Sequence, residues 1–193
     1  MKNVAVIGAG ITGITLANLL QKKFNLTVFE KSRGVGGRMA TRRAEPYQFN
    51  HGAQYFKIEN KEFKDFMQPL MVNKIIKPLK TNQIEILNKK VIKRTKIYNQ
   101  QYFTAESKMN SVVKYLINNN FSIKLLCKIE KIIKENDKWF VIDSGQVSFG
   151  PYDWLIITIP PNQAKEILYN NFKFLDIIKK IKMRSCYSLM LGF

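Results

Sequence analysis

The sequence is poor in the side chains that build disulfide frameworks and metal sites. It has two cysteines, Cys127 and Cys186, without CxxC spacing, and a single histidine, His51. Two such distant cysteines fit a reducing compartment and argue against a zinc site. No apolar run approaches the roughly 18 residues of a transmembrane helix, and the chain enters its first apolar run without a cleavable leader. We therefore expect a soluble, cytoplasmic protein with no metal and no membrane partner.

Acidic residues are also scarce. The 193 residues hold 14 Asp and Glu against 32 Lys and Arg, a formal net charge of +18. Clustered cations would indicate nucleic-acid binding, but here Lys is spread among Asn and Ile along the whole chain. This distribution is typical of compositional bias, so nucleic acid is not expected as a partner. The charge should still steer anionic, phosphate-bearing ligands toward the protein.

The most informative motif lies near the amino terminus. Residues 4–7 form an apolar run with the length and β-branched content of a buried parallel strand. Gly8, Gly10 and Gly13 follow as GxGxxG. In such a motif the first glycine allows a tight turn, the second lets the backbone approach a pyrophosphate, and the third lets the helix pack on the strand.

The next residues complete the context that this motif requires. A helix is expected over residues 11–23, with its free N–H groups and positive end directed at the pyrophosphate. A second strand, residues 26–29, ends at Glu30, whose carboxylate can accept both ribose hydroxyls and repels a 2′-phosphate. A plain strand-turn-helix would explain the glycines but not this complete order. The stretch therefore predicts a dinucleotide site that disfavours NADP.

A second glycine-rich loop follows, with Arg33, Gly34, Gly36, Gly37 and Arg38. It can bring backbone and guanidinium groups to the same pyrophosphate. A basic surface loop would account for the arginines but not for the glycine doublet.

These motifs carry a resemblance to a known family. EKSRGVGGRMATRR at residues 30–43 and HGAQYF at 51–56 resemble flavin-dependent oxidoreductases that include the amine oxidases, and are most similar to renalase-like proteins. The resemblance covers nearly the whole chain and implies FAD as the tightly held dinucleotide. It implies isoalloxazine contacts from Arg42, Arg43 and residues 51–55, and an adenine contact from the backbone at Ile129. The cofactor-binding residues expected in all are Gly8, Ala9, Gly10, Ile11, Thr12, Gly13, Glu30, Lys31, Gly37, Arg38, Met39, Arg42, Arg43, His51, Gly52, Ala53, Gln54, Tyr55, Ile129 and Pro160.

No catalytic residue is assigned, because the flavin would carry the chemistry. His51 is as well explained by a structural role beside a glycine turn as by catalysis.

The expected fold is α/β: a Rossmann-type FAD-binding domain, with a parallel sheet and helices, plus an incomplete β-rich substrate domain. The first domain would comprise residues 1–56 and 102–170, and the second residues 57–101 and 171–193. Periodicity and turn residues predict further helices at 61–76, from a cap at Ser107 to about 119, at 162–169 and at 173–182. They predict strands at 83–87, 94–98, 121–126, 128–134, 138–142, 146–149, 154–159 and 185–193, the pieces at 83–87 and 94–98 lying in the substrate sheet. Asp143, Ser144 and Gly145 are expected to form the hairpin turn before the strand at 146–149.

Two departures from the resembled family stand out. The family usually carries an acid where this chain has Asn50. It also continues past Phe193 and supplies a Gly-Asp pair that holds FAD, whereas this sequence contains no such pair. We expect the last strand to leave an open sheet edge that favours self-association or a partner.

Three functions remain open. The first is a renalase-like FAD oxidoreductase that oxidises a dihydronicotinamide, NAD(P)H or an isomer, with oxygen as the acceptor. The second is a flavin amine oxidase. The third is an inactive, truncated FAD-binding fragment, or a subunit that needs a partner.

Overall fold

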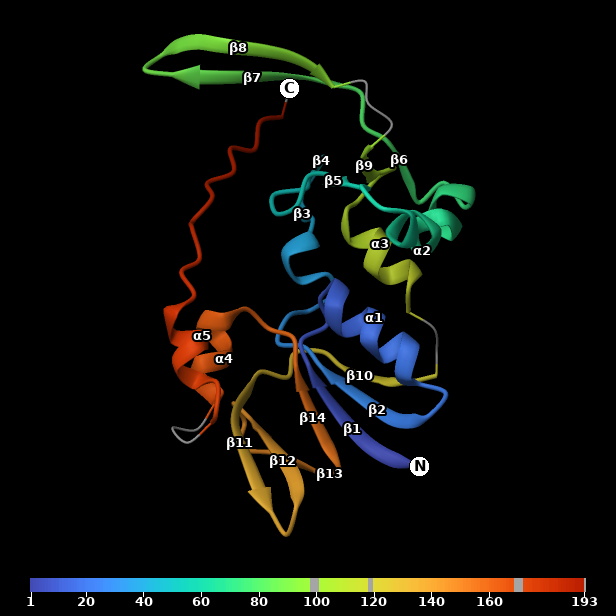
Figure 1. The fold of residues 1–193 in the computed structure, drawn as a ribbon, viewed down its shortest axis with the longest axis vertical. Coiled ribbons are helices and arrows are strands. Elements are labelled where there is room, and N and C mark those ends of the chain that lie inside the picture. The colour runs from blue at the N-terminus through green and yellow to red at the C-terminus, as the bar shows by residue number, and fades with distance from the viewer. Residues whose placement is uncertain (98–100, 118–119, 169–171, 193) are drawn as a thin grey trace. The chain divides into compact units, whose positions relative to one another are not determined.

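A computed structural model describes residues 1–97, 101–117, 120–168 and 172–192 (Figure 1). The chain forms two compact units, one of Met1–Arg38 with Leu116–Leu189 and one of Met39–Tyr115 with Met190–Phe193. The second unit thus holds residues 39–56 and 102–115, which the sequence had suggested for the FAD-binding part. Which residues make up the two functional domains stays a prediction.

The first unit is built on a four-stranded parallel sheet in the order β10-β2-β1-β14. Helix α1 connects β1 to β2, and α4 and α5 follow β14. This parallel sheet with its helices confirms the predicted α/β fold and its Rossmann-like part. The elements are β1 Lys2–Ile7, α1 Ile11–Leu20, β2 Phe24–Phe29, β10 Ser122–Lys124, β14 Trp154–Ile157, α4 Pro161–Ile167 and α5 Leu175–Lys180.

A three-stranded antiparallel sheet shares a buried core with this parallel sheet. Its strands are β11 Ile129–Glu135, β12 Lys138–Asp143 and β13 Ser148–Tyr152. The turn before β13 follows the prediction, because Asp143 Oδ1 accepts hydrogen bonds from the N–H groups of Gly145 and Val147, both at 2.9 Å.

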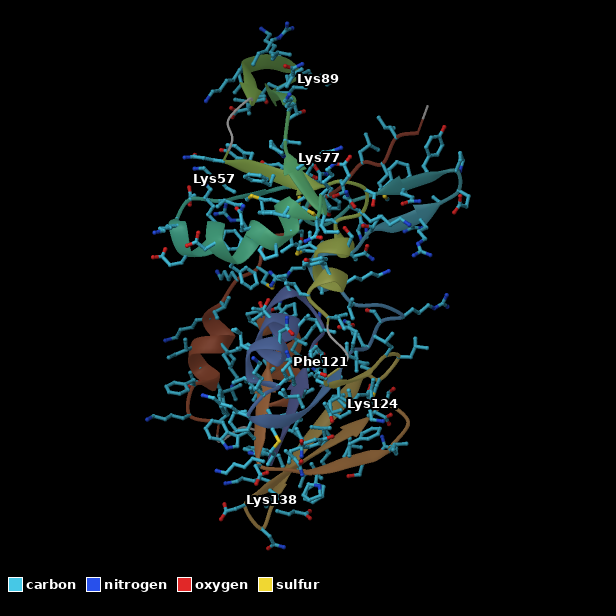
Figure 2. All side chains as sticks on the ribbon, turned by 90° about the vertical axis from the view of Figure 1, so that its right-hand side faces the viewer. Lys57, Lys77, Lys89, Phe121, Lys124 and Lys138 are labelled. Atoms are coloured by element: carbon cyan, nitrogen blue, oxygen red, sulfur yellow. The ribbon has the colours of Figure 1, made fainter. Side chains whose placement is uncertain are left out.

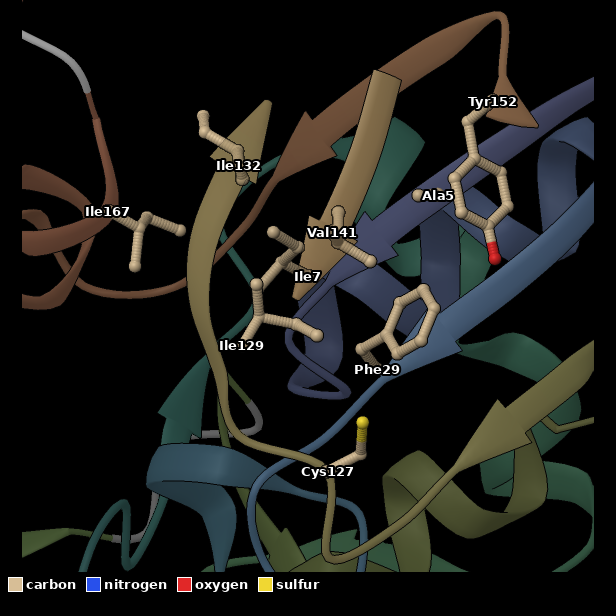
Figure 3. Packing of buried hydrophobic residues seen from close by; sticks show 9 residues of the cluster. All are labelled: Ala5, Ile7, Phe29, Cys127, Ile129, Ile132, Val141, Tyr152 and Ile167. Carbon is tan, nitrogen blue, oxygen red and sulfur yellow. The ribbon is translucent and has the colours of Figure 1, made fainter. Parts of the chain in front are cut away.

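The core of the first unit joins these two sheets (Figure 3). Phe29 of β2 is almost fully buried, and its ring lies 6.1 Å from that of Tyr152 in an edge-on arrangement. Burial raises the pKa of the Cys127 thiol, which lies 3.7 Å from Asp143 Oδ2. The buried cluster comprises Ala5, Ile7, Phe29, Cys127, Ile129, Ile132, Val141, Tyr152 and Ile167. Because β1 and β2 supply three of its members, this core fixes the strands that lead into the glycine turn.

In its described residues, the second unit combines small antiparallel sheets with two α-helices. Strands β5, β9 and β6 form one sheet, β3 pairs with β4, and β7 pairs with β8. The elements are β3 Arg42–Ala44, β4 Tyr47–Phe49, β5 Phe56–Lys57, α2 Lys61–Val72, β6 Ile76–Pro78, β7 Thr81–Leu87, β8 Lys90–Ile97, β9 Tyr102–Ala105 and α3 Asn110–Tyr115. The short helix η1 Gly37–Met39 spans the boundary between Arg38 and Met39.

Helix α2 is shorter than the sequence predicted. It begins at the predicted residue, Lys61, after Asn60, whose Oδ1 accepts the N–H of Phe63 at 2.8 Å, but it ends at Val72. Lys74 has a left-handed φ of 54°, which an α-helix of L-residues does not continue. The prediction of a helix to residue 76 is therefore wrong, because Ile76 already belongs to β6.

Two strand predictions also need correction. The pieces at 83–87 and 94–98 fall in β7 and β8, but these form a separate two-stranded hairpin rather than part of a larger sheet. Residues 185–192 form no strand in the described part of the chain, because β-propensity alone gives no ladder without a paired neighbour. Four predicted elements end at residues 98, 119, 169 and 193, and these end residues lie outside the described part of the chain.

Candidate functional site

The first glycine turn is closed by contacts that leave no room for a side chain. Gly8 has a φ of 105°, and its N–H donates to the carbonyl of Phe29 at 2.8 Å. Thr158 Oγ1 lies 3.0 Å from the carbonyl oxygens of both Ile7 and Gly8. A methyl group at Gly13 would stand 1.9 Å from the carbonyl oxygen of Gly8. The first and third glycines therefore have the packing roles that the motif predicts.

The middle glycine faces open space. A methyl group at Gly10 would meet no heavy atom within 4 Å among the described residues. Gly10 also stands at the amino end of α1, where no side chain caps the helix and no acidic residue lies in the first turn. The N–H groups of this turn, which begins with Ile11 and Thr12, thus form a positive end suited to an anion.

Glu30 is 6% exposed and sits beside this turn. Its Oε2 accepts the N–H of Ala9 and its Oε1 accepts that of Ser32, both at 2.9 Å. An ionised carboxylate can accept about four hydrogen bonds, so two acceptor positions remain beyond these contacts. Glu30 therefore stabilises the turn and can still accept hydrogen bonds from two neighbouring hydroxyl groups.

The second glycine loop lies directly against the first. The N–H of Gly36 donates to the carbonyl of Ala9 at 3.0 Å, and Gly36 forms a parallel bridge with Gly10. Gly37 has a φ of 53°, and a methyl group there would lie 3.3 Å from Cα of Gly10. Val35 is buried and anchors the loop. The two loops thus form one backbone-lined surface.

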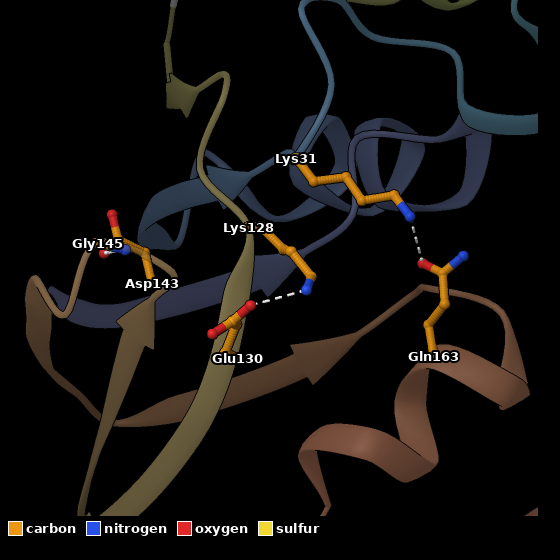
Figure 4. A network of polar contacts seen from close by, with 6 residues as sticks. All are labelled: Lys31, Lys128, Glu130, Asp143, Gly145 and Gln163. Atoms are coloured by element: carbon orange, nitrogen blue, oxygen red, sulfur yellow. Dashed lines mark hydrogen bonds and ion pairs between the residues drawn. The ribbon is translucent and has the colours of Figure 1, made fainter.

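Cationic side chains surround this surface. Arg33 and Arg38 are exposed on the second loop. Lys31 is also exposed, and its Nζ donates to Oε1 of Gln163 on α4 at 3.2 Å (Figure 4). Pro160 precedes α4 as its cap residue. These charges complement the diphosphate of a dinucleotide.

The residues just before Ile129, the predicted adenine contact, are hydrogen-bonded through the backbone to the segment of Glu30. Leu126 has a φ of 56°, and its N–H donates to the carbonyl of Ser32 at 3.1 Å. The next N–H, of Cys127, donates to the carbonyl of Glu30 at 2.9 Å. The Ile129 side chain is buried in the core, so a ligand contact there is left to its backbone.

The remaining predicted residues lie in the second unit. Arg42 and Arg43 are exposed on β3, and Met39 ends the short helix η1. Ala53 is half-buried, whereas His51, Gly52, Gln54 and Tyr55 are exposed. The structure thus gathers one predicted set in the first unit and the other in the second. Their role as one cofactor site stays a prediction.

Asn50 holds the segment that carries His51 to Tyr55. Its Oδ1 accepts the hydroxyl of Thr41 at 2.7 Å and the N–H of Met109 at 2.9 Å. At the other end of this segment, the hydroxyl of Thr104 donates to the carbonyl of Gln54 at 2.9 Å. Asn50, and not the expected Ser107, therefore makes the side-chain contact observed just before α3.

We expect Asn50→Leu to destabilise the second unit by about 1–3 kcal/mol, because it removes the shared acceptor of two donors while keeping a similar size. Asn50→Asp keeps both acceptor positions and should stay within about 1 kcal/mol of the parent. Urea unfolding, with limited proteolysis of residues 39–55, measures both. Equal losses in the two variants would contradict this role.

Sequence reasoning missed three contributors: Thr158, Leu126 and the structural role of Asn50. The position of Thr158, near the carboxyl end of an apolar strand and shortly before two prolines, could have marked it as a residue that contacts the glycine turn. No local signal marks Leu126, since nothing in its residue type favours a left-handed backbone.

Comparison with known proteins agrees with this geometry. Residues 6–70 match the family described as NAD(P)-binding Rossmann-like domain. Over 180 residues the chain is 31% identical to renalase of Mus musculus. The aligned stretch covers 86% of this chain and 49% of that protein. The chain is homologous to renalase. It spans about half the length of this curated relative.

The fold of this renalase homologue also matches solved structures. One is described as a protoporphyrinogen oxidase from Exiguobacterium sp. 255-15, with a TM-score of 0.68 and 12% identity over 93% of this chain and 63% of that one. An oxidoreductase from Methanosarcina mazei gives a TM-score of 0.67 at 12% identity, over 93% and 65% of the two chains. Both similarities concern the fold.

The described residues hold neither a candidate membrane span nor a candidate metal cluster. None of their helices combines the length and the apolar character that a bilayer crossing requires. Within the same ranges, no three His, Cys, Asp or Glu side chains gather in a way that could hold a metal ion.

Proposed function

We propose that this chain is the FAD-binding part of a renalase-like oxidoreductase whose cofactor-binding residues are those predicted above. When bound, FAD would accept a hydride from a dihydronicotinamide, NAD(P)H or an isomer, and pass the two electrons to oxygen to give hydrogen peroxide. The homology to renalase supports the choice of FAD. The protein would contribute binding, orientation and electrostatics.

The observation that carries the proposal is the surface made by the two glycine loops. Gly10 leaves a methyl-sized space beside the uncapped end of α1, and Gly37 packs against its Cα. A pyrophosphate fits this surface because it needs close backbone approach and positive potential. Glu30 retains acceptor positions for the adjacent ribose diol, and its charge disfavours a 2′-phosphate.

The first test is the visible absorbance of the purified protein, followed by release and identification of the bound dinucleotide. We expect FAD. A colourless protein that stays folded and takes up no added FAD would contradict the proposal for this chain.

Gly10→Ala gives a sharper test, because the methyl group costs the fold nothing but fills the space proposed for the pyrophosphate. We expect an unchanged melting temperature and FAD affinity lowered by about 100-fold, equivalent to about 2.7 kcal/mol. Gly34→Ala is the control, because Gly34 also faces open space but is neither among the predicted cofactor-binding residues nor in the contact between the loops. Unchanged FAD binding in the Gly10 variant would refute this placement.

Turnover assays distinguish the proposed reaction from amine oxidation. Peroxide formation with reduced nicotinamide dinucleotides, and none with amines, is expected for a protein that binds FAD. The opposite pattern would assign the amine oxidase reaction instead.

A further inference from the structure

The hairpin of β7 and β8 forms a sheet of only two strands. Its turn is well formed, since Asn88 and Lys89 both have left-handed φ values, 49° and 61°, as a tight hairpin turn requires. Two-stranded hairpins alone are marginally stable in water. Contact with another surface would therefore supply stability that the two strands lack by themselves.

The hairpin exposes an unusual amount of aliphatic surface. Strand alternation and the pairing of Ile86 with Val91 place these two side chains on the same face as Ile84. Large apolar side chains that remain exposed together mark an interaction surface. The exposed aliphatic residues, each between 46% and 64% exposed, are Ile84, Ile86, Leu87, Val91 and Ile92.

Cations accompany these aliphatic side chains. Residues 80–94 hold five cations and one acid, Glu85, for a net charge of +4. Lys89 lies at the tip of the hairpin (Figure 2), and Glu85 pairs in register with Lys93. The cations, all exposed, are Lys80, Lys89, Lys90, Lys93 and Arg94.

This combination favours one kind of occupant. A second copy of the chain would bring the same charge, +18 in total, against a hairpin of +4. Single-stranded nucleic acid is usually held by aromatic stacking, and residues 80–94 contain no aromatic side chain. An anionic bilayer surface instead pairs phosphate groups with the cations and takes the aliphatic side chains into its interface.

We propose that the β7–β8 hairpin binds the surface of membranes rich in anionic phospholipids. The sequence had indicated no membrane partner because it lacks a long apolar run, which excludes a spanning helix but not surface binding. The proposal rests on the hairpin alone and is independent of FAD.

The test is co-sedimentation of the full chain with vesicles. One set is pure phosphatidylcholine, and in the other about one third of the lipid is phosphatidylserine, which supplies the negative surface. We expect binding only to the second set, weakened by added salt.

Two hairpin variants separate its parts. Lys90→Glu with Arg94→Glu should lower the affinity at least about 20-fold, because each basic residue near an anionic surface contributes roughly fivefold. Ile84→Ser with Ile86→Ser should lower it about tenfold without changing the charge. The control Lys22→Glu with Lys23→Glu makes the same charge change on exposed residues of the first unit. It should cost less than about threefold if the hairpin is the contact, because charges outside the contact with the lipid are screened by salt.

Equal losses in the hairpin and control variants would overturn the proposal and leave only attraction by the total charge. So would absent or composition-independent vesicle binding. Hairpin-dependent binding to duplex DNA or hairpin-dependent dimerisation, without vesicle binding, would assign the surface to that occupant instead. Circular dichroism and FAD content, measured alongside, distinguish a folding defect and a failure of the proposed function from a failure of this inference.

Discussion

Gly13→Ala should destabilise the first unit by at least about 3 kcal/mol, at the upper end of what overpacking costs. The added methyl group would stand 1.9 Å from the carbonyl oxygen of Gly8 and 2.9 Å from Thr158 Oγ1. Alanine is favoured over glycine inside a helix by about 1 kcal/mol, which is too little to offset this overlap. Thermal unfolding should show a melting temperature lowered by about 10 °C.

Gly34→Ala is the matched control for this change. It makes the same substitution in the second glycine loop. There the added methyl group would have no heavy atom of the described residues within 4 Å besides its chain neighbours, and φ of Gly34 is not positive. The control should stay within about 0.5 kcal/mol of the parent. If Gly13→Ala melted like Gly34→Ala, the close approach of α1 to the turn would be wrong.

The parts predicted well from the sequence are those specified by local signals. The strand at residues 4–7, the glycine spacing and the acid after the second strand belong to one continuous stretch. In this motif each of these residue types has a defined structural role, so the sequence alone predicts it. The turn at Asp143 was predicted for the same reason.

The parts predicted poorly depend on partners distant in the chain. Thr158 contacts the carbonyl of Gly8 across 150 residues, and Asn50 reaches Met109 across 59. The apolar periodicity that reaches Leu70 and Met71 predicted a helix to residue 76, whereas the chain turns at Lys74 and uses Ile76 to pair with Ala105. Residues 185–192 have β-like composition but no paired neighbour among the described strands, so their propensity does not become structure.

Glu30→Gln should separate the structural role of this carboxylate from its role toward a cofactor. Both oxygens accept backbone N–H groups at 2.9 Å, whereas an amide offers one oxygen and turns an NH₂ toward the other donor. Without FAD, we expect a loss of about 2 kcal/mol, because hydrogen bonds to a buried charged group are worth about 1.5–3 kcal/mol each. Urea unfolding of the FAD-free protein measures this loss.

The same variant should bind FAD about 100-fold more weakly, since an amide has fewer acceptor positions left for the ribose diol. Glu130→Gln is the control: Glu130 is an exposed glutamate that pairs with Lys128 Nζ at 2.7 Å, and its loss should cost less than about 1 kcal/mol. FAD titration by fluorescence quenching measures the affinity in both. Lower stability with unchanged FAD affinity would leave Glu30 as a brace of the glycine turn alone, whereas lower affinity at equal stability would make its hydrogen bonds to Ala9 and Ser32 energetically dispensable.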